Sequence, residues 1–195
     1  MHFLLDKSDL CLYNSPLSIE TKGKLTMQWF EKLAGWIERR GGKRELFRRG
    51  VDGQPSLYME RFYLVKSKYF ELMLHRFHMS DAVDVHDHPW TSFGCILKNG
   101  YIEHLGDNEK SVRRVAGNIS YRNSKIFHRV ELAKGTEGNV WTIFGTFKRV
   151  SDWGFLVDKT WVPFEKYFKS NGTLDVQTLP EQYHGLIFPT KVITA

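Results

Sequence analysis

The chain has 195 residues, 14% of them aromatic, and a formal net charge of +6. This length favours a single domain that buries a full core without disulfides, and the aromatic content argues against general disorder. The two cysteines, Cys11 and Cys95, make no disulfide framework, as is typical of a reducing compartment. No segment approaches the roughly 20 apolar residues of a membrane helix, and residues 1–7 lack a signal-peptide pattern. We therefore expect a cytoplasmic protein that does not enter a membrane.

Residues 1–56 are predicted to form an N-terminal segment with one amphipathic helix over residues 22–40. Apolar side chains recur at helical spacing and form one stripe, and Gly41-Gly42 ends the pattern. The stripe is interpreted as core packing and contains Leu25, Trp29, Phe30, Leu33, Trp36 and Ile37. The basic cluster between Arg39 and Arg49 is interpreted as solvated surface after this helix. Nucleic acid is not an expected partner, because no RNA-binding motif or DNA-reading helix accompanies the cluster.

From residue 57 onward the pattern changes to short strands separated by turns containing glycine and asparagine. Such a pattern predicts a mainly β fold, a sandwich or barrel, over residues 57–160. Residues 161–195 are predicted to be a C-terminal extension that packs on the barrel, with a short helix near 161–168. Strands are expected at 57–65, 69–78, 83–88, 92–98, 100–105, 111–115, 118–122, 126–132, 139–148 and 153–157.

The sequence His86-Asp87-His88, followed forty residues later by His128, is the strongest chemical signal. Side chains at i and i+2 of a strand point to the same face, so His86 and His88 are expected to lie side by side. Neutral imidazole is a common ligand of iron, zinc, copper and nickel. With a third histidine from a neighbouring strand, the pattern predicts a metal site formed by His86, His88 and His128. A hydrogen-bonded pair of strand histidines is the alternative interpretation.

This stretch resembles the two sequence motifs of the cupin superfamily. The first motif is matched by His86, His88 and Gly100, and the second by Gly117 and His128, all at the family spacing. The resemblance covers about half of the chain, roughly residues 57–157. It implies a cupin-type double-stranded β-helix, a jelly-roll barrel, here preceded by an N-terminal helix. It is less informative about chemistry, because this fold carries many reactions and also proteins that are not enzymes.

The chain departs from the family at the usual glutamate ligand, where Phe93 stands. Because phenylalanine binds no metal, the expected site is a neutral three-histidine site with open coordination positions. Glu103, on the next predicted strand, is the alternative carboxylate that reaches the pocket.

Among cupins, cysteine dioxygenase is similar in two places, His86-Asp87-His88 and the segment from His128 to Glu131. By that resemblance Arg61 binds a substrate carboxylate, which suits the fork of a guanidinium group. The continuation Pro89-Trp90 departs from that enzyme. It is more similar to a set of uncharacterised cupins, some from phages and bacteria.

The resulting hypothesis is a metal-binding cupin, most plausibly a mononuclear dioxygenase-like oxidoreductase that uses Fe(II) on a small anionic substrate such as a carboxylate. Zinc, nickel and manganese are alternative metals. The side chains expected to line the pocket are Trp90, Phe93, Cys95, Glu103 and Trp141. The alternative hypothesis is a non-catalytic cupin, a small-molecule sensor or structural module. A homodimer formed through edge strands is expected by analogy alone.

Overall fold

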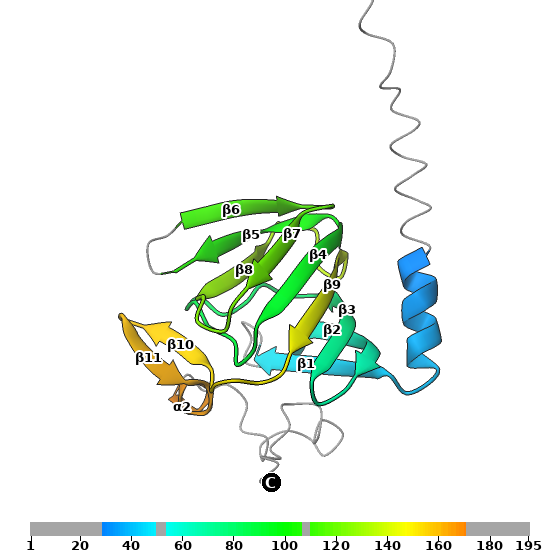
Figure 1. The fold of residues 1–195 in the computed structure, drawn as a ribbon. Coiled ribbons are helices and arrows are strands. Elements are labelled where there is room, and N and C mark those ends of the chain that lie inside the picture. Colours follow the sequence, from blue (N-terminus) through cyan, green and yellow to red (C-terminus); the bar gives the residue numbers. More distant parts are fainter. Residues whose placement is uncertain (1–28, 50–53, 107–109, 171–195) are drawn as a thin grey trace, which may run out of the picture.

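The computed structural model describes residues 29–49, 54–106 and 110–170, and these form one helix at residues 29–38 followed by eleven strands and a short second helix (Figure 1). The strands before the histidines are β1 Lys43–Arg49, β2 Pro55–Lys66 and β3 Phe70–Phe77. The central strands are β4 Ser92–Lys98, β5 Gly100–Leu105, β6 Lys110–Val115, β7 Ile119–Arg122, β8 His128–Leu132 and β9 Val140–Phe147. The last elements are β10 Gly154–Val157, β11 Thr160–Pro163 and α2 Phe164–Ser170.

Two antiparallel sheets face each other and enclose the core. One has the order β1-β2-β3-β9-β4-β7 and the other β6-β5-β8. The segment at His86 continues the second sheet, because it pairs with β8 at His128. Four strands, β3-β9-β4-β7, therefore oppose the four-membered row of β6, β5, β8 and the His86 segment. This is the strand order of a jelly roll, so the double-stranded β-helix predicted from the sequence is confirmed.

The space between the sheets is filled by apolar side chains from both. Met59, Phe77 and Val140 from the six-stranded sheet pack against Val130 and Leu132 from β8. The histidines lie farther along the same interior, where polar side chains replace the apolar ones.

The helix at residues 29–38 covers the outer face of the larger sheet (Figure 1). Its buried side chains, Phe30, Ala34 and Ile37, pack against Phe62 and Trp141 of the sheet. The predicted helix is thus present, although its predicted residues 22–28 lie outside the described part of the chain.

The predicted apolar stripe of that helix is wrong at two of its members. Trp29 and Trp36 are 58% and 46% exposed. Trp36 lies under the guanidinium group of Arg40, 3.8 Å from the ring centroid, which is a cation–π contact. The stripe that faces the sheet is therefore narrower than the sequence pattern suggested.

The interpretation of the basic cluster as solvated surface after a helix holds for Arg39 and Arg40, which are exposed, but not for Lys43–Arg49, which forms strand β1 at the edge of the larger sheet. The ammonium group of Lys43 contacts Glu38, Glu45 and Glu60 at 3.0, 2.8 and 2.8 Å. Leu46, between the charged residues, is buried against Met59. The ion pairs of Lys43 and the burial of Leu46 explain how so basic a segment forms a strand. The sheet therefore begins before residue 57, where the sequence pattern predicted its start.

Two further predictions differ from the structure near the ends of the barrel. The strand expected at 83–88 is reduced to single bridges at His86. The helix expected near 161–168 begins only at Phe164, because β10 and β11 first form a hairpin. The rest of the predicted C-terminal extension, residues 171–195, lies outside the described residues.

Glu60 supports a prediction about pH. Burial alone would raise the pKa of its carboxyl group, but His78 and Lys43 outweigh burial and lower the pKa to about 2, against an ordinary value of 4.5. A carboxyl group with a lowered pKa stabilises the fold above its unfolded-state pKa, and this stabilisation is lost as the pH falls from 4.5 to 2. We expect Glu60→Gln to reduce the fall in the free energy of unfolding between pH 4.5 and pH 2 by on the order of 3 kcal/mol. Denaturant unfolding at a series of pH values measures this difference.

Glu45→Gln is the matched control, since Glu45 contacts the same lysine but its side chain is 34% exposed, against 8% for Glu60. Equal flattening by both variants would contradict the role given to Glu60.

The two motif glycines are required for different reasons. A Cβ atom at Gly100 would lie 2.1 Å from the carbonyl oxygen of Arg114, which belongs to the backbone of the paired strand. Gly117 instead has a φ of 90°, in a turn where a Cβ atom would meet nothing within 4 Å. Gly100 is required because the paired strand leaves no room for a Cβ atom, and Gly117 is required because its backbone has a positive φ.

We expect Gly100→Ala to lower the free energy of unfolding by about 1–3 kcal/mol, because the backbone of β6 must move. Gly35→Ala, in the first helix, is the control. It should raise the free energy of unfolding by up to about 1 kcal/mol, because alanine has a higher helix propensity than glycine. Its Cβ atom would meet only the end of the Arg39 side chain, at 3.5 Å. Thermal unfolding of both variants measures the difference, and equal stability of Gly100→Ala and the parent would contradict the steric argument.

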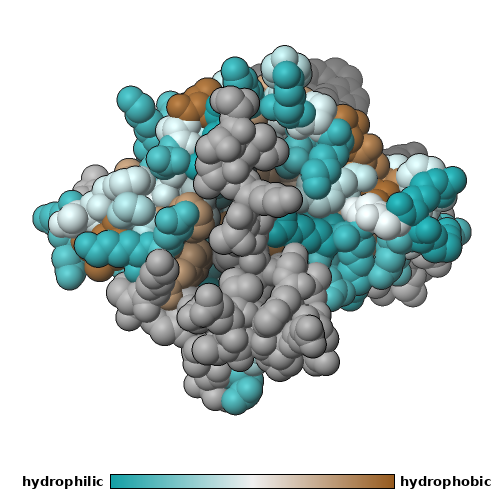
Figure 2. Space-filling model, turned by 90° about the horizontal axis from the view of Figure 1, so that it is seen from below, coloured by the Kyte–Doolittle hydropathy of each residue, from teal (hydrophilic) through white to brown (hydrophobic). Residues whose placement is uncertain are grey.

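Seen from below, the described surface is largely hydrophilic, with apolar side chains in separate groups (Figure 2). Among the residues described, no helix has the length and apolar character needed to cross a membrane.

Candidate metal centre

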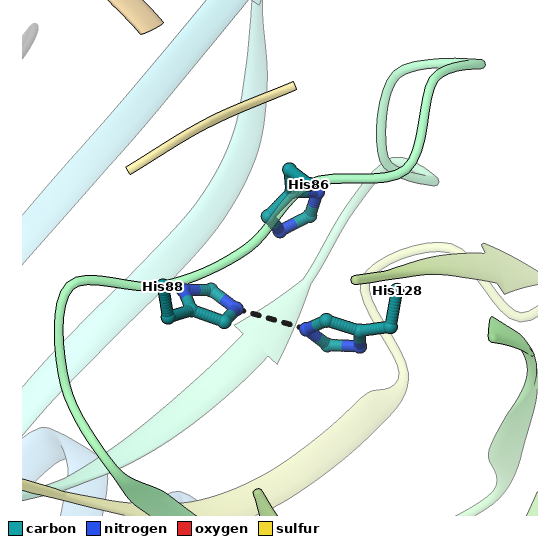
Figure 3. A group of neighbouring side chains, drawn as sticks. All are labelled: His86, His88 and His128. Carbon is teal, nitrogen blue, oxygen red and sulfur yellow. Dashed lines mark hydrogen bonds between the residues drawn. The ribbon is translucent and has the colours of Figure 1, made fainter. Parts of the chain in front are cut away.

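His86, His88 and His128 converge on one point inside the barrel (Figure 3). One nitrogen atom from each ring lies within 4.8 Å of the corresponding atoms of the other two. The ring centroids are separated by 4.9 Å, 5.1 Å and 5.0 Å, and the Nε2 atoms of His88 and His128 are only 2.8 Å apart. Three nitrogen donors at such distances can coordinate a single first-row metal ion.

Backbone pairing places the three rings. The N–H of His86 donates to the carbonyl oxygen of His128, and the N–H of His128 donates back to His86, both at 2.9 Å. His88 follows two residues later on the same extended segment and therefore points the same way. Asp87 points away between them, and its carboxylate accepts the N–H of Gly154 at 2.7 Å, which joins the segment to β10.

Glu103 orients the third histidine. Its Oε1 atom accepts a hydrogen bond from Nδ1 of His128 at 2.9 Å, and its side chain is completely buried. A proton fixed on Nδ1 leaves the lone pair of Nε2 directed toward His86 and His88. A carboxylate behind a histidine is the usual partner of a metal ligand, because it sets the tautomer and raises the basicity of the ring.

Two arginines hold Glu103 in its ionised form. Nε of Arg114 donates to Oε2 at 2.8 Å, and a terminal nitrogen of Arg122 donates to Oε1. Burial by itself would raise the pKa of this carboxyl group. The hydrogen bond from His128 and the charges of the arginines outweigh burial and lower the pKa to about 2. Glu103 is therefore anionic throughout the physiological pH range.

His86 and His88 are neutral near pH 7. Burial lowers the pKa of His86 to about 4, with smaller contributions from His128 and Arg122, and burial also lowers the pKa of His88 well below its ordinary value. Neutral imidazole is the form that binds metal. In addition, Nδ1 of His86 is buried without a hydrogen-bond partner among the described residues. The donor set and this unsatisfied atom both fit a divalent metal.

Aromatic rings surround the histidines on two sides. Trp153 and Phe155, on or next to β10, lie 6.1 and 5.5 Å from the ring of His86. Trp90 stacks on His88 at 6.1 Å with an angle of 18° between the rings, and Phe144 lies 6.4 Å from His88. These rings limit the access of water to the site.

Three residues expected to line the pocket lie elsewhere. Trp141 packs on Phe62 under the first helix, at 5.9 Å. Phe93 packs against Phe70, at 6.3 Å, and over Gly145, where a Cβ atom would meet its ring at 2.2 Å. Cys95, two residues after Phe93, shares its face. All three side chains lie on the outer face of the larger sheet, where other apolar side chains also pack, so the apolar character of a strand residue does not show which face it occupies.

The remaining expected residues are in or near the site. Trp90 contacts His88, and Glu103 contacts His128 from behind instead of approaching the point where the three rings meet. Arg61, on β2, pairs across the strands with His75. The charge of Arg61 contributes to the lowered pKa values of both His75 and His88, so it lies in the same interior.

The sequence did not predict the positions of four residues near the histidines. These are Arg114 and Arg122, which contact Glu103, Phe155, which packs against His86, and the buried His75. A signal was available for Arg114, which lies on the strand after Glu103 and pairs with it as β6, since a buried carboxylate needs cationic partners. Arg122 lies on β7 of the other sheet, so its contact with Glu103 depends on the tertiary structure. His75 is 4% exposed, and its Nε2 atom is buried with no partner in the described residues.

Comparison with known proteins gives a limited result. No protein-family model matches the chain, and no curated protein matches it. Among solved structures, hydroxypropylphosphonic acid epoxidase from S. wedmorenis is 20% identical, with a TM-score of 0.40 over 53% of this chain and 55% of that one. The chain thus spans about half the length of that enzyme.

Two further structures are similar to the same degree. An uncharacterised conserved protein with a double-stranded β-helix domain, from Klebsiella pneumoniae, is 13% identical, with a TM-score of 0.41 over 50% of this chain and 84% of that one. A putative mannose-6-phosphate isomerase from Ralstonia eutropha is 13% identical, with a TM-score of 0.42 over 49% of this chain and 88% of that one. The fold assigned here rests on the strand order of the chain itself.

Proposed function

We propose that the protein binds one divalent metal, with Fe(II) as the resident ion, and acts as a mononuclear dioxygenase-like oxidoreductase on a small anionic substrate. The observation that carries the proposal is the convergence of three histidines, one of them oriented by the buried carboxylate of Glu103. Histidines that bind a metal usually have such a partner on the other ring nitrogen. When bound, iron would supply the redox chemistry with dioxygen, while the protein supplies orientation and electrostatics.

The side chains of this chain have separate tasks in the proposal. His86, His88 and His128 hold the metal, and Glu103 keeps a proton on Nδ1 of His128. As no carboxylate is among the three ligands, the charge of the metal is left for an anionic substrate to balance. The surrounding aromatic rings exclude water from the reacting groups.

Arg61 is proposed to bind the negatively charged group of the substrate. Its Nε atom is buried without a partner among the described residues, as is Nε2 of the neighbouring His75. A buried guanidinium nitrogen without a hydrogen-bond partner is costly, and a carboxylate would satisfy it. We expect Arg61→Gln to raise KM for a carboxylate substrate by about tenfold or more while the metal content stays unchanged.

The first test is metal content. Protein reconstituted separately with Fe(II), zinc, nickel and manganese, then desalted, is expected to retain about one metal ion per chain. Failure to retain any of the four metals would refute the metal site. Oxygen uptake by the iron form with thiol-containing carboxylates then tests the reaction, beside hydrolysis assays of the zinc form.

A non-catalytic sensor or structural module is the second candidate. The stacking of Trp90 on His88 favours it, since this ring occupies space next to the histidines. Stoichiometric metal without oxygen uptake or hydrolysis, together with an increase in thermal stability on metal binding, would support this candidate over the enzyme.

A further inference from the structure

A second site lies beside β7, apart from the histidines. The structure has a cavity there of about 610 Å³, within the usual size range of small-molecule sites. None of the three histidines lines it. Arg122 lines it and is joined to His128 by hydrogen bonds through Glu103.

The lining of this cavity is strongly basic. Arg114, Arg122 and Lys125 contribute three positive charges, and no aspartate or glutamate is among the described residues that line the cavity. Within the described part of the chain, the carboxylate that contacts these cations is that of Glu103, which lies behind the lining residues and neutralises one charge. An excess of two positive charges in a concave site attracts anions.

The cavity also has an apolar side. Ile119 and Tyr121, on β7, are 73% and 70% exposed, and Ile126 is 37% exposed. Their neighbours Ser120 and Arg122 point inward, as the alternation of a strand requires, and Arg122 donates to Ser120 at 2.9 Å. Large apolar side chains gathered beside several cations are typical of a site for a ligand that carries both an anionic group and an apolar body.

We infer that this cavity binds a small organic anion, an aromatic or similarly flat apolar group bearing a phosphate or carboxylate. Arg114 and Lys125 bind the anionic group, and the ring of Tyr121 with Ile119 packs on the apolar body. The site is separate from the metal centre and does not depend on the proposed reaction.

Calorimetric titration of the full chain, after treatment with a chelator, tests the inference with four probes. Phenyl phosphate and benzoate carry both features, inorganic phosphate carries only the charge, and benzyl alcohol carries only the ring. We expect whichever organic anion the site prefers to bind at least about tenfold more tightly than both single-feature probes. The comparison of phenyl phosphate with benzoate identifies the anionic group.

Variants then locate the binding. Lys125→Gln and Tyr121→Ser, both at exposed positions, should each weaken binding of the preferred anion by about threefold to tenfold without lowering the melting temperature. Lys134→Gln, an exposed lysine outside the cavity, should have no effect. Absence of binding by both organic anions, equal binding of inorganic phosphate, or equal binding by all three variants would overturn the inference.

Discussion

Replacing His128 by alanine is expected to abolish stoichiometric metal binding, with a loss of affinity of more than about 100-fold. His128 supplies one of three nitrogen donors and is the only one of them whose ring is oriented by a buried carboxylate. Two remaining imidazoles bind a divalent ion too weakly to retain it through desalting. Elemental analysis after reconstitution, with the parent protein beside the variant, measures the effect.

His104→Ala is the matched control for this variant. His104 also lies on the β5–β8 pair and also contacts a glutamate, Glu131, at 2.8 Å, but it is no member of the converging trio. The control should keep the metal content of the parent. If both variants lost metal equally, or if neither did, the assignment of His128 as a ligand would be wrong.

Replacing Glu103 by alanine is expected to produce the largest loss of stability, about 3–5 kcal/mol in the free energy of unfolding. Glu103 is completely buried and contacts Arg114, Arg122 and His128 at once. Its removal leaves the guanidinium group of Arg122, which is 5% exposed, buried without its counter-charge. Denaturant unfolding of the metal-free protein measures this loss separately from any contribution of a metal.

Glu131→Ala provides the comparison, because Glu131 also contacts a histidine and an arginine but its side chain is 44% exposed. Exposed ion pairs contribute little, so this variant should lose less than about 1 kcal/mol. Glu103→Gln, which keeps the shape of the side chain, should lie between the two. A loss at Glu103 no larger than that at Glu131 would show that the buried network is not a major source of stability.

The sequence by itself determined the strand pattern and the three histidines of the candidate metal centre. Strands from β2 to β10 follow from local alternation and turn residues, and the i, i+2 spacing places His86 and His88 on one face whatever the rest of the fold does. His128 could be added because its spacing from Gly117 matches a family pattern. Each of these inferences depends on short-range geometry, which a sequence carries directly.

Only the tertiary structure decided which face of each strand points toward the three histidines. Phe93, Cys95 and Trp141 are apolar and lie on strands, but all three belong to the outer face of the larger sheet. Trp141 packs there under the helix at residues 29–38, and Phe93 packs on Phe70. Periodicity cannot distinguish one apolar face from the other. Tertiary structure also decided that Glu103 supports His128 from behind, since this contact joins two strands that are 25 residues apart along the chain. Hydrogen bonds between such distant residues depend on sheet register, and that is why the orientation of the metal site emerged only from the folded chain.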